Sequence, residues 1–325
     1  MTQTMPAVRG RWLELATSVL GRLVEMSAII LVISMVSFGL LSFTKGDVAT
    51  AAVQAKGIAV TPERVAAERH RLGLDLPVAQ RYLNTLGRAS HGDLGVSVRT
   101  GREVTGEIAE RLGPTITLAA AGALVTAVVG LLFGLVETVA QGRAVPALLR
   151  GVSLVFVSLP GFALAFLLVA LFSVELGWFP TQGMSGGLGA LVLPALVLGL
   201  PAGAALGRVL STRLQELLSE QFLVTARAQG YPRAGSILRW ALPNAAVTSL
   251  VVGGNILAVL VTSTIVVEQV FGWPGIGSYL LDSLRFRDWY PLQASVLLLS
   301  ALSIAVRGLS LALAAAVDPR ARVAR

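Results

Sequence analysis

The chain has 325 residues, of which 54% are hydrophobic and only 14% carry a formal charge. Because an average soluble domain is roughly 25% charged, this composition indicates a membrane protein. The formal net charge of +8 comes from arginines that separate apolar segments, a pattern that favours a topology signal over nucleic-acid binding. The absence of cysteine excludes disulfides and thiolate metal sites, and the two histidines, His70 and His91, lack a ligand-spaced partner.

The first apolar run covers residues 23–43 and follows a tail that contains several arginines. The apolar core of a signal peptide is about 7–15 residues long and precedes a small-residue cleavage site, whereas this run is longer. We therefore expect residues 1–43 to form a tail and a retained first transmembrane helix.

Residues 44–113 mix acidic and basic residues and contain few long apolar runs, which predicts a soluble segment of about seventy residues between two spans. Thr61 and Pro62 predict a helix start, with threonine as the N-cap and proline at the first helical position. A second helix is expected over residues 104–111, and residues 92–98 are typical of a turn followed by a short extended piece.

Five further apolar runs meet the requirement of about 20 residues for a helix that crosses roughly 30 Å of hydrocarbon. The run at 151–174 carries Pro160 and Gly161 near its middle, where we expect a kink. The sequence therefore predicts an all-α polytopic membrane protein with six transmembrane helices, five of them in a core at 114–317. The five runs are 115–135, 151–174, 188–207, 247–267 and 292–317.

The distribution of arginine sets the expected orientation. Six spans place both termini on the same side of the membrane. The polar interval 208–246 and the C-terminal tail 318–325 are rich in arginine, whereas residues 175–187 contain no basic residue. By the positive-inside rule, we expect both termini and the 208–246 loop in the cytoplasm and residues 44–113 outside.

The 208–246 interval contains a predicted helix–turn–helix. Ala226 and Ala228 favour a helix, Gly230 can adopt a positive φ that turns the chain, and Pro232 suits the first turn of a new helix. An ordinary basic loop between spans is the alternative interpretation. The positive charge comes from three arginines, namely Arg227, Arg233 and Arg239.

Glycines recur at every fourth position on two of the predicted spans. Small residues at this spacing let helix backbones approach closely in lipid. Two interpretations remain, namely packing within one subunit, or a surface that contacts a second subunit or slides during gating. The glycines are Gly130 and Gly134 in the run 115–135, and Gly199, Gly203 and Gly207 in the run 188–207.

Polar residues are rare within the spans. Asn255 interrupts the run 247–267, and Arg307 lies roughly 22 Å along the run 292–317, within snorkelling range of the cytoplasmic interface. Both are candidates for a pathway or gate, with snorkelling as the alternative for Arg307. No carboxylate or histidine lies deep in a span, which disfavours a proton-coupled secondary transporter. No phosphate-binding P-loop motif or catalytic constellation occurs either.

The stretch 222–243 resembles the EAA loop of permease subunits of ATP-binding-cassette (ABC) importers. That pattern has a hydrophobic residue ten positions after a glycine, and Leu-Pro two positions later. Gly230, Trp240 and Leu242-Pro243 match it. The segment Thr225–Gly230 is similar to the Thr-Ala-Arg-Ala-Lys-Gly of the peptide-importer branch, with glutamine in place of lysine, although the acidic residue of the EAA opening is absent.

Further motifs extend the resemblance over residues 20–320, to the first permease subunit of the dipeptide, oligopeptide and nickel importers. The last span departs from the family pattern, with Arg307 and Leu311 where an asparagine and an aspartate are usual. The matching residues outside the loop include Asp75, Gly92, Asp93, Gly95, Glu268, Trp273, Pro274 and Gly275.

The resemblance implies a non-catalytic subunit with the type I ABC importer permease fold in a bacterial plasma membrane. It implies a second homologous permease, two ATPase subunits or one fused ATPase, and an extracytoplasmic substrate-binding protein. ATP and magnesium are expected on the ATPases, and no cofactor, metal or nucleic acid on this chain. Thr225–Gly230 and Arg233 would pass ATPase movement to the spans. Di- or oligopeptides are the expected cargo, with a nickel chelate or haem as the alternative and a self-sufficient transporter or channel as a remote one.

Overall fold

The computed structural model describes residues 27–39, 48–55, 57–140, 142–184 and 186–317. Over these residues the chain is helical almost throughout, and the one extended pairing is an isolated bridge between Val96 and Glu103. The predicted all-α class is confirmed. Besides the helix Ser27–Gly39, the elements are α2 (Val48–Ala55), α3 (Pro62–Arg71), α4 (Val78–Ser90), α5 (Val104–Val139), α6 (Ala144–Ser158), α7 (Gly161–Leu168), α8 (Leu188–Leu217), α9 (Gln221–Ala228), α10 (Arg233–Ser236), α11 (Leu242–Phe271), α12 (Ile276–Arg285), α13 (Trp289–Val317) and the π-helical segments η1 (Val169–Glu175) and η2 (Ile237–Ala241).

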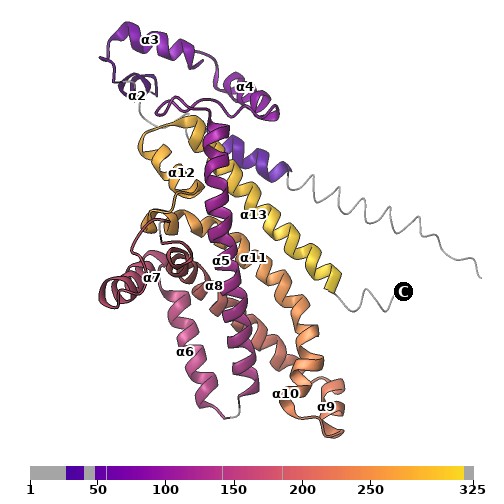
Figure 1. Cartoon of the computed structure of the whole chain (residues 1–325). Helices are drawn as coiled ribbons and strands as arrows, with labels where there is room; N and C mark the ends of the chain where they lie inside the picture. The colour runs from indigo at the N-terminus through magenta and orange to yellow at the C-terminus, as the bar shows by residue number, and fades with distance from the viewer. Residues whose placement is uncertain (1–26, 40–47, 56, 141, 185, 318–325) are drawn as a thin grey trace, which may run out of the picture.

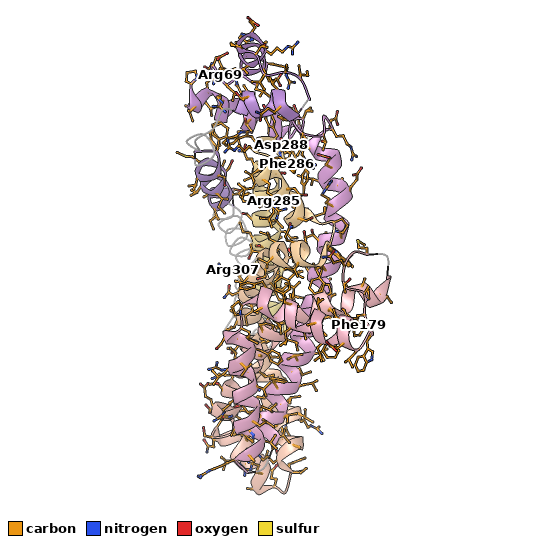
Figure 2. The ribbon with its side chains drawn as sticks, turned by 90° about the vertical axis from the view of Figure 1, so that its left-hand side faces the viewer. Arg69, Phe179, Arg285, Phe286, Asp288 and Arg307 are labelled. Atoms are coloured by element: carbon orange, nitrogen blue, oxygen red, sulfur yellow. The ribbon has the colours of Figure 1, made fainter. Side chains whose placement is uncertain are left out.

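Long helices form the body of the molecule (Figure 1). α5 runs through most of its length, with α8, α11 and α13 beside it. The short helices α2, α3 and α4 lie at one end of this bundle, and α9 and α10 lie at the other. The view turned by 90° shows the same elongated shape, with Arg69 near the α2–α4 end and Arg307 farther along the bundle (Figure 2). The molecule therefore has two distinct ends joined by apolar helices.

Four described helical stretches are long and apolar enough to cross a membrane, and a bent pair adds a fifth candidate. The four are α5, α8, α13 and the continuous stretch Arg233–Phe271, and the bent pair is α6 with α7–η1. Of the predicted first span, 23–43, the structure describes only the helix Ser27–Gly39, and the rest lies outside the described residues. Each of the other five predicted apolar runs falls on one of these helices, which agrees with a polytopic membrane fold.

The expected kink at Pro160 and Gly161 is a full break. Ala144–Ser158 and Gly161–Glu175 are separate helices bent by 107°. Proline restricts the residue before it to extended backbone, and Leu159 has φ −75° and ψ 127°. The predicted run 151–174 is therefore divided between two helices, since α6 begins before this run and α7 leaves the bundle direction (Figure 1).

Two helices extend beyond their predicted spans. α5 begins at Val104 and continues through Pro114, so the short helix and the separate span predicted on either side of this proline are one element. α8 continues to Leu217, so the polar interval 208–246 begins within a helix. Both helices contain proline, Pro114 in α5 and Pro194 and Pro201 in α8. Each proline removes one backbone hydrogen bond, but the remaining bonds within the helix keep it continuous.

α5 and α8 pack against each other along a line of glycines. A Cβ at Gly203 would lie 2.7 Å from the Cβ of Val129, and a Cβ at Gly134 would lie 2.7 Å from Cδ2 of Leu210. Since these distances are shorter than van der Waals contact, glycine is what lets the two helices lie this close. The line therefore makes a contact within one chain. Its other members are Gly122, Gly130, Gly199 and Gly207.

Candidate functional site

The chain turns sharply between α9 and α10, which together form a hairpin. Gly230 has φ +87°, and the amides of Gly230 and Tyr231 donate to the carbonyls of Arg227 and Ala226. These bonds close the last turn of α9, and the left-handed backbone at the glycine is unfavourable for a residue with a Cβ. The helix–turn–helix expected from the sequence is thus present, with glycine at the turn.

The hairpin has a buried base and an exposed outer face. Leu223 of α9 is fully buried and packs in one cluster with Leu214 of α8 and Ile237 of η2, which are also fully buried. On the other side of α9, Phe222 and Val224 are 43% and 53% exposed. The base fixes the hairpin to two long helices, while the outer face exposes apolar and basic groups to solvent.

The residues that the sequence singled out in this loop divide between the two faces. Ala226 is buried against the base. Thr225, Arg227, Ala228 and Gly230 are exposed. The loop motif therefore contributes mainly to a surface, with one small residue that allows close packing below it.

Arg233 is bound to the chain's own bundle. Its Nη2 donates to the carbonyl oxygen of Thr138, near the end of α5, at 3.1 Å. Beside it, Nε of Arg150 on α6 pairs with Glu137 at 2.6 Å, and the Glu137 side chain is only 5% exposed. No pattern in the sequence indicated the Arg233–Thr138 contact. It attaches the start of α10 to α5.

A wide helical turn precedes Leu242 and Pro243. The backbone is π-helical over Ile237–Ala241, and α11 begins at Leu242. Proline cannot donate to the carbonyl four residues earlier, and its ring presses against that carbonyl. The π-helical spacing of hydrogen bonds admits the proline into the continuous stretch Arg233–Phe271. Nearby, Trp240 packs edge-to-face on Tyr231 of the turn, with ring centroids 4.7 Å apart.

A buried carboxyl group organises the opposite part of the bundle. Glu268 has no exposed surface, its Oε1 accepts the Thr115 hydroxyl at 2.8 Å, and its Oε2 accepts the amide of Ser278 at 2.9 Å. Thr115 Oγ1 in turn accepts the amide of Ile276 at 2.8 Å. A Cβ on Gly275 would overlap the Glu268 carboxyl, so this position has room only for glycine. One carboxyl group thus joins α5, α11 and α12.

Trp273, in the loop between α11 and α12, adds two hydrogen bonds to the region around Glu268. Its Nε1 donates to the carbonyl of Pro114 at 3.0 Å, and its amide donates to the carbonyl of Glu268 at 2.8 Å. Pro274, next in the chain, is exposed. The structure therefore brings together Glu268, Trp273 and Gly275, and it adds Thr115, which the sequence analysis did not single out.

A second buried carboxylate holds the segment after α4. Asp288 is 2% exposed and accepts the Ser97 hydroxyl at 2.6 Å and the amides of Val98 and Arg99 at 3.1 Å each. These donors lie about 190 positions earlier in the chain. Asp288, at the start of α13, therefore anchors the polar segment to the bundle.

Glu107 and Tyr279 form a further buried pair that the sequence analysis missed. The Tyr279 hydroxyl donates to Oε2 of Glu107, and the Arg111 guanidinium lies 4.3 Å from the Tyr279 ring centroid. Burial raises the pKa of the Tyr279 hydroxyl, and the hydrogen bond to Glu107 adds to this rise. Glu107 and Arg111 are four residues apart, a spacing that places both on one face of the predicted helix. Nothing in the sequence identified the distant tyrosine as their neighbour.

The remaining motif residues shape turns near this pair. Gly92 and Gly95 have φ +81° and +88°, and Oδ1 of Asp93 accepts the Gly95 amide at 2.8 Å. Gly95 lies directly against the Tyr290 ring, where a Cβ would approach to 2.7 Å. Asp75 lies apart from them, exposed in the connection between α3 and α4.

Asn255 and Arg307 occupy different parts of the bundle. Asn255 lines a cavity of about 540 Å³ between α7, α8 and α11, whose walls are mostly apolar, as at Phe162 and Val259. Arg307 is exposed on α13 and does not line that cavity. The two candidates for a pathway or gate are therefore not brought together.

The described residues contain no group of three or more histidine, aspartate or glutamate side chains placed to hold a metal ion. The polar clusters above join helices through hydrogen bonds. The arrangement as a whole has an exposed hairpin at one end and a hydrogen-bonded polar structure at the other.

Two family matches cover most of the chain. Residues 126–323 match the family described as "Binding-protein-dependent transport system inner membrane component", and residues 16–119 match "Binding-prot-dependent transport system membrane comp, N-term". The glutathione transport system permease protein GsiC of Escherichia coli (strain K12) is 33% identical over 304 residues, which cover 94% of this chain and 98% of that protein. The same permease from Shigella dysenteriae serotype 1 (strain Sd197) matches to the same extent.

These relatives are permease subunits of ABC transporters, which are non-catalytic membrane components. The predicted resemblance and the non-catalytic role are confirmed, and the family implies a partner permease, an ATPase and a substrate-binding protein. Since the matches fall on the bundle and on the segment that precedes it, this chain belongs to the family of inner-membrane permease components of binding-protein-dependent ABC importers.

Proposed function

We propose that this chain is the first permease subunit of an ATP-driven importer of di- or oligopeptides. It forms the translocation pathway with a second homologous permease. Two ATPase subunits, or one fused ATPase, bind the α9–α10 hairpin, and an extracytoplasmic binding protein delivers cargo at the α2–α4 end. The observation that carries the proposal is the hairpin, which is fixed to the bundle at its base and exposed on its outer face.

The charge distribution supports a cytoplasmic position for the hairpin. Arg227 on α9 and Arg239 on η2, just after α10, are exposed, and short arginine-rich loops face the cytoplasm. This orientation places both termini in the cytoplasm, the core 114–317 in the membrane and residues 44–113 outside. The α2–α4 segment is then the part of the chain that an extracytoplasmic protein meets first.

The base of the hairpin explains how movement reaches the spans. Leu214, Leu223 and Ile237 place α8, α9 and η2 in one buried cluster, and Arg233 binds the end of α5. A shift of α9 in a groove of the ATPase therefore displaces the ends of three long helices together. Closure of the ATPase pair on ATP would in this way change the pathway from inward-facing to outward-facing.

The relatives support peptides as the cargo class, because they are named for glutathione, which is a tripeptide. The cavity beside Asn255 has mostly apolar walls and offers few groups for selecting one side chain over another. Selection among peptides therefore falls mainly to the binding protein.

Reconstitution tests the proposal. The chain is co-expressed with a homologous permease and an ATPase from the same genome, placed in vesicles, and assayed for uptake and ATP hydrolysis. The additions are the binding protein alone, or the binding protein with dipeptides, glutathione, a nickel chelate or haem. Stimulation by peptide-loaded binding protein supports the proposal. A response to the nickel chelate or haem alone would reassign the cargo, and failure to copurify with any ATPase would contradict the importer assembly.

A further inference from the structure

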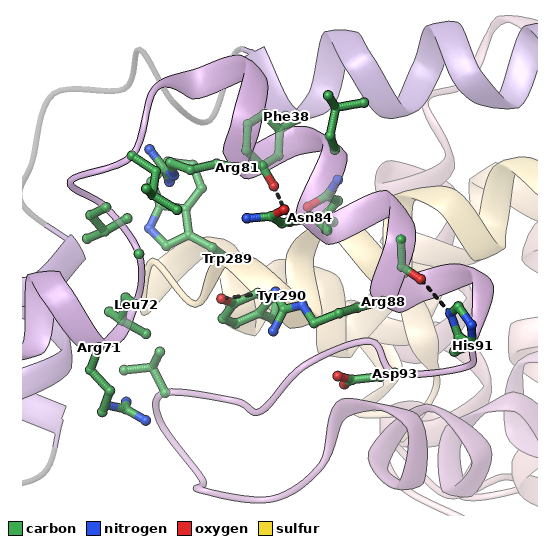
Figure 3. A pocket seen from close by; sticks show the side chains of 18 residues that line it. Phe38, Arg71, Leu72, Arg81, Asn84, Arg88, His91, Asp93, Trp289 and Tyr290 are labelled. Atoms are coloured by element: carbon green, nitrogen blue, oxygen red, sulfur yellow. Dashed lines mark hydrogen bonds between the residues drawn. The ribbon is translucent and has the colours of Figure 1, made fainter.

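A polar cavity lies at the α2–α4 end, away from the hairpin and from Asn255. It has a volume of about 730 Å³ and lies between the helix Ser27–Gly39, the α3–α4 segment and the start of α13. Figure 3 shows Arg88 beside Tyr290, and Arg81 and Trp289 also line the cavity. The cavity thus combines cationic and aromatic walls from elements far apart in sequence.

Two arginines of α4 reach this cavity without an acidic partner. The guanidinium of Arg81 lies 5.6 Å from the Phe38 ring centroid, and that of Arg88 lies 5.1 Å from the Tyr290 ring centroid. Nη2 of Arg88 also donates to the Tyr290 hydroxyl at 3.3 Å. Neither arginine forms an ion pair with a carboxylate in the part of the chain that the structure describes.

The other charged groups of the cavity wall already have contacts. Arg71 is paired with Glu68, and the Asp93 carboxylate accepts the amide of Gly95. Three arginines, Arg71 and the two of α4, thus face two carboxylates, so the cavity keeps a net positive charge. Burial lowers the pKa of the Arg81 guanidinium, as expected for a cation that is partly removed from water without a counter-charge.

The cavity lies beside an apolar helix, within the length of Ser27–Gly39. The Tyr82 hydroxyl on α4 donates to the carbonyl of Leu31 at 3.4 Å, and the Tyr82 ring packs on Phe38 at 5.4 Å between centroids. Leu31 and Phe38 are separated by about 10 Å along their helix. Since α4 contacts both residues, it lies alongside this apolar helix and does not only cover its end.

Apolar side chains continue from the cavity onto the outer surface. Leu83 of α4 lines the cavity and is 63% exposed. On the helix Ser27–Gly39, Val32, Met35 and Val36 are 61%, 66% and 53% exposed. A cationic pocket therefore adjoins a surface suited to acyl chains, with aromatic residues of the kind that occupy the interface.

We propose that this cavity binds the acidic head group of a phospholipid of the outer leaflet, with its phosphate at Arg81 and Arg88. The acyl chains lie along the exposed side of the helix Ser27–Gly39. Guanidinium groups are suited to phosphate oxygens. A zwitterionic head group would bring another cation towards the unpaired arginines, so the site prefers a lipid such as phosphatidylglycerol. Only the choice of leaflet rests on the orientation given under the proposed function.

The test measures lipid retention on the purified assembly of both permeases and the ATPase. The delipidated complex is mixed with phosphatidylglycerol or phosphatidylcholine, and bound lipid is counted by native mass spectrometry. We expect the double substitution Arg81→Gln/Arg88→Gln to lower phosphatidylglycerol affinity about tenfold or more, as for loss of charge-assisted hydrogen bonds. The matched control is Arg64→Gln/Arg285→Gln, which removes two exposed arginines outside the cavity and should leave affinity unchanged.

Several results would overturn the proposal. They are equal retention of the two lipids, equal loss in the control variant, or displacement of phosphatidylglycerol by millimolar inorganic phosphate or by a dipeptide. Arg81→Lys/Arg88→Lys should recover part of the retention, and this separates loss of charge from misfolding. Peptide-stimulated ATP hydrolysis, measured in parallel, tests the proposed transport function separately from lipid binding.

Discussion

The hairpin α9–α10 and the region around Glu268 differ in where their motif residues lie. The hairpin shows most of its motif residues to solvent and has one polar attachment to α5, through Arg233. Around Glu268, the motif residues other than Pro274 are buried, and one fully buried carboxyl group accepts hydrogen bonds from α5 and α12. The hairpin exposes its outer face to solvent, whereas the Glu268 region fixes helices relative to one another.

This difference shows that two motifs matching the same family pattern have different physical roles. A residue in the hairpin is constrained mainly by backbone shape and by what binds its outer face. A residue near Glu268 is constrained by neighbours of its own chain, since a buried donor left unpaired is costly. Substitutions at the first end should therefore affect transport before stability, and substitutions at the second should do the reverse.

The largest effect is expected from Glu268→Ala. The change leaves the Thr115 hydroxyl and the Ser278 amide without their acceptor in a buried place. We expect a loss of about 3 kcal/mol or more in the free energy of unfolding, and little folded protein in the membrane. Thermal unfolding in detergent and the amount of membrane-inserted chain measure this effect.

Glu216→Ala is the control for removing a glutamate. Glu216 pairs with Arg213 on the surface and is 56% exposed, so its loss should change the unfolding free energy by less than about 1 kcal/mol. Glu268→Gln keeps one acceptor oxygen and should fall between the two. If Glu268→Ala unfolded at the same temperature as Glu216→Ala, the Glu268 region would not be a brace.

Gly230→Asp should abolish uptake and peptide-stimulated ATP hydrolysis while the subunit remains in the membrane. The turn needs φ +87°, which a residue with a Cβ adopts only under strain, and the open space around Gly230 leaves room for the new side chain. The expected damage is thus to the shape of the partner surface. Uptake, ATP hydrolysis and membrane level are measured together.

Gly142→Asp is a matched control for this substitution. Gly142 also has φ +87° and open space for a Cβ, but it lies in the α5–α6 connection. The Gly142→Asp variant introduces the same strain and charge as Gly230→Asp, but outside the hairpin. We therefore expect it to keep most of the uptake. Equal loss of uptake in both variants would attribute the defect to strain or charge in any such loop and not to the hairpin.

The α5–α8 contact is expected to respond to a single methyl group. At Gly199 a Cβ would overlap the side chain of Val125 and would lie 2.8 Å from the Gly122 carbonyl oxygen. Gly199→Ala should therefore lower the unfolding free energy by about 1–3 kcal/mol, the usual effect of overpacking. Gly151→Ala, in α6 with no atom near the added Cβ, should have no such effect in the same thermal assay. Equal unfolding temperatures for the two variants would contradict the close contact.

The sequence predicted features that depend on local or periodic patterns. Thr61 caps α3, with Pro62 at the first turn, as the pattern indicated. The glycine turn at 230 follows from the same local chemistry. The break at Pro160 was stronger than the expected kink, because the backbone of Leu159 is extended as well. Pro114 shows the opposite, since its helix continues. A proline in the sequence indicates where a helix can break, but the surrounding packing decides whether the helix ends there.

Contacts between distant segments could not be predicted in this way. The hydroxyl of Tyr279 meets Glu107 from 172 positions away, and no sequence period links them. Arg233 was expected to help pass ATPase movement to the spans, and it is exposed. Its bond to the Thr138 carbonyl depends on where α5 ends relative to α10, which only the fold determines.

The smallest expected effects distinguish the two arginines of the hairpin. Arg233→Ala removes the bond to Thr138 and should lower the unfolding free energy of the subunit by about 1 kcal/mol. Arg227→Ala removes an exposed arginine and should leave that quantity unchanged, while weakening ATPase binding about two- to fivefold, as for a surface ion pair. Thermal unfolding of the permease pair and titration with the ATPase give the two quantities separately. An unchanged unfolding temperature for Arg233→Ala, with the same loss of ATPase binding as Arg227→Ala, would place both arginines on the partner surface.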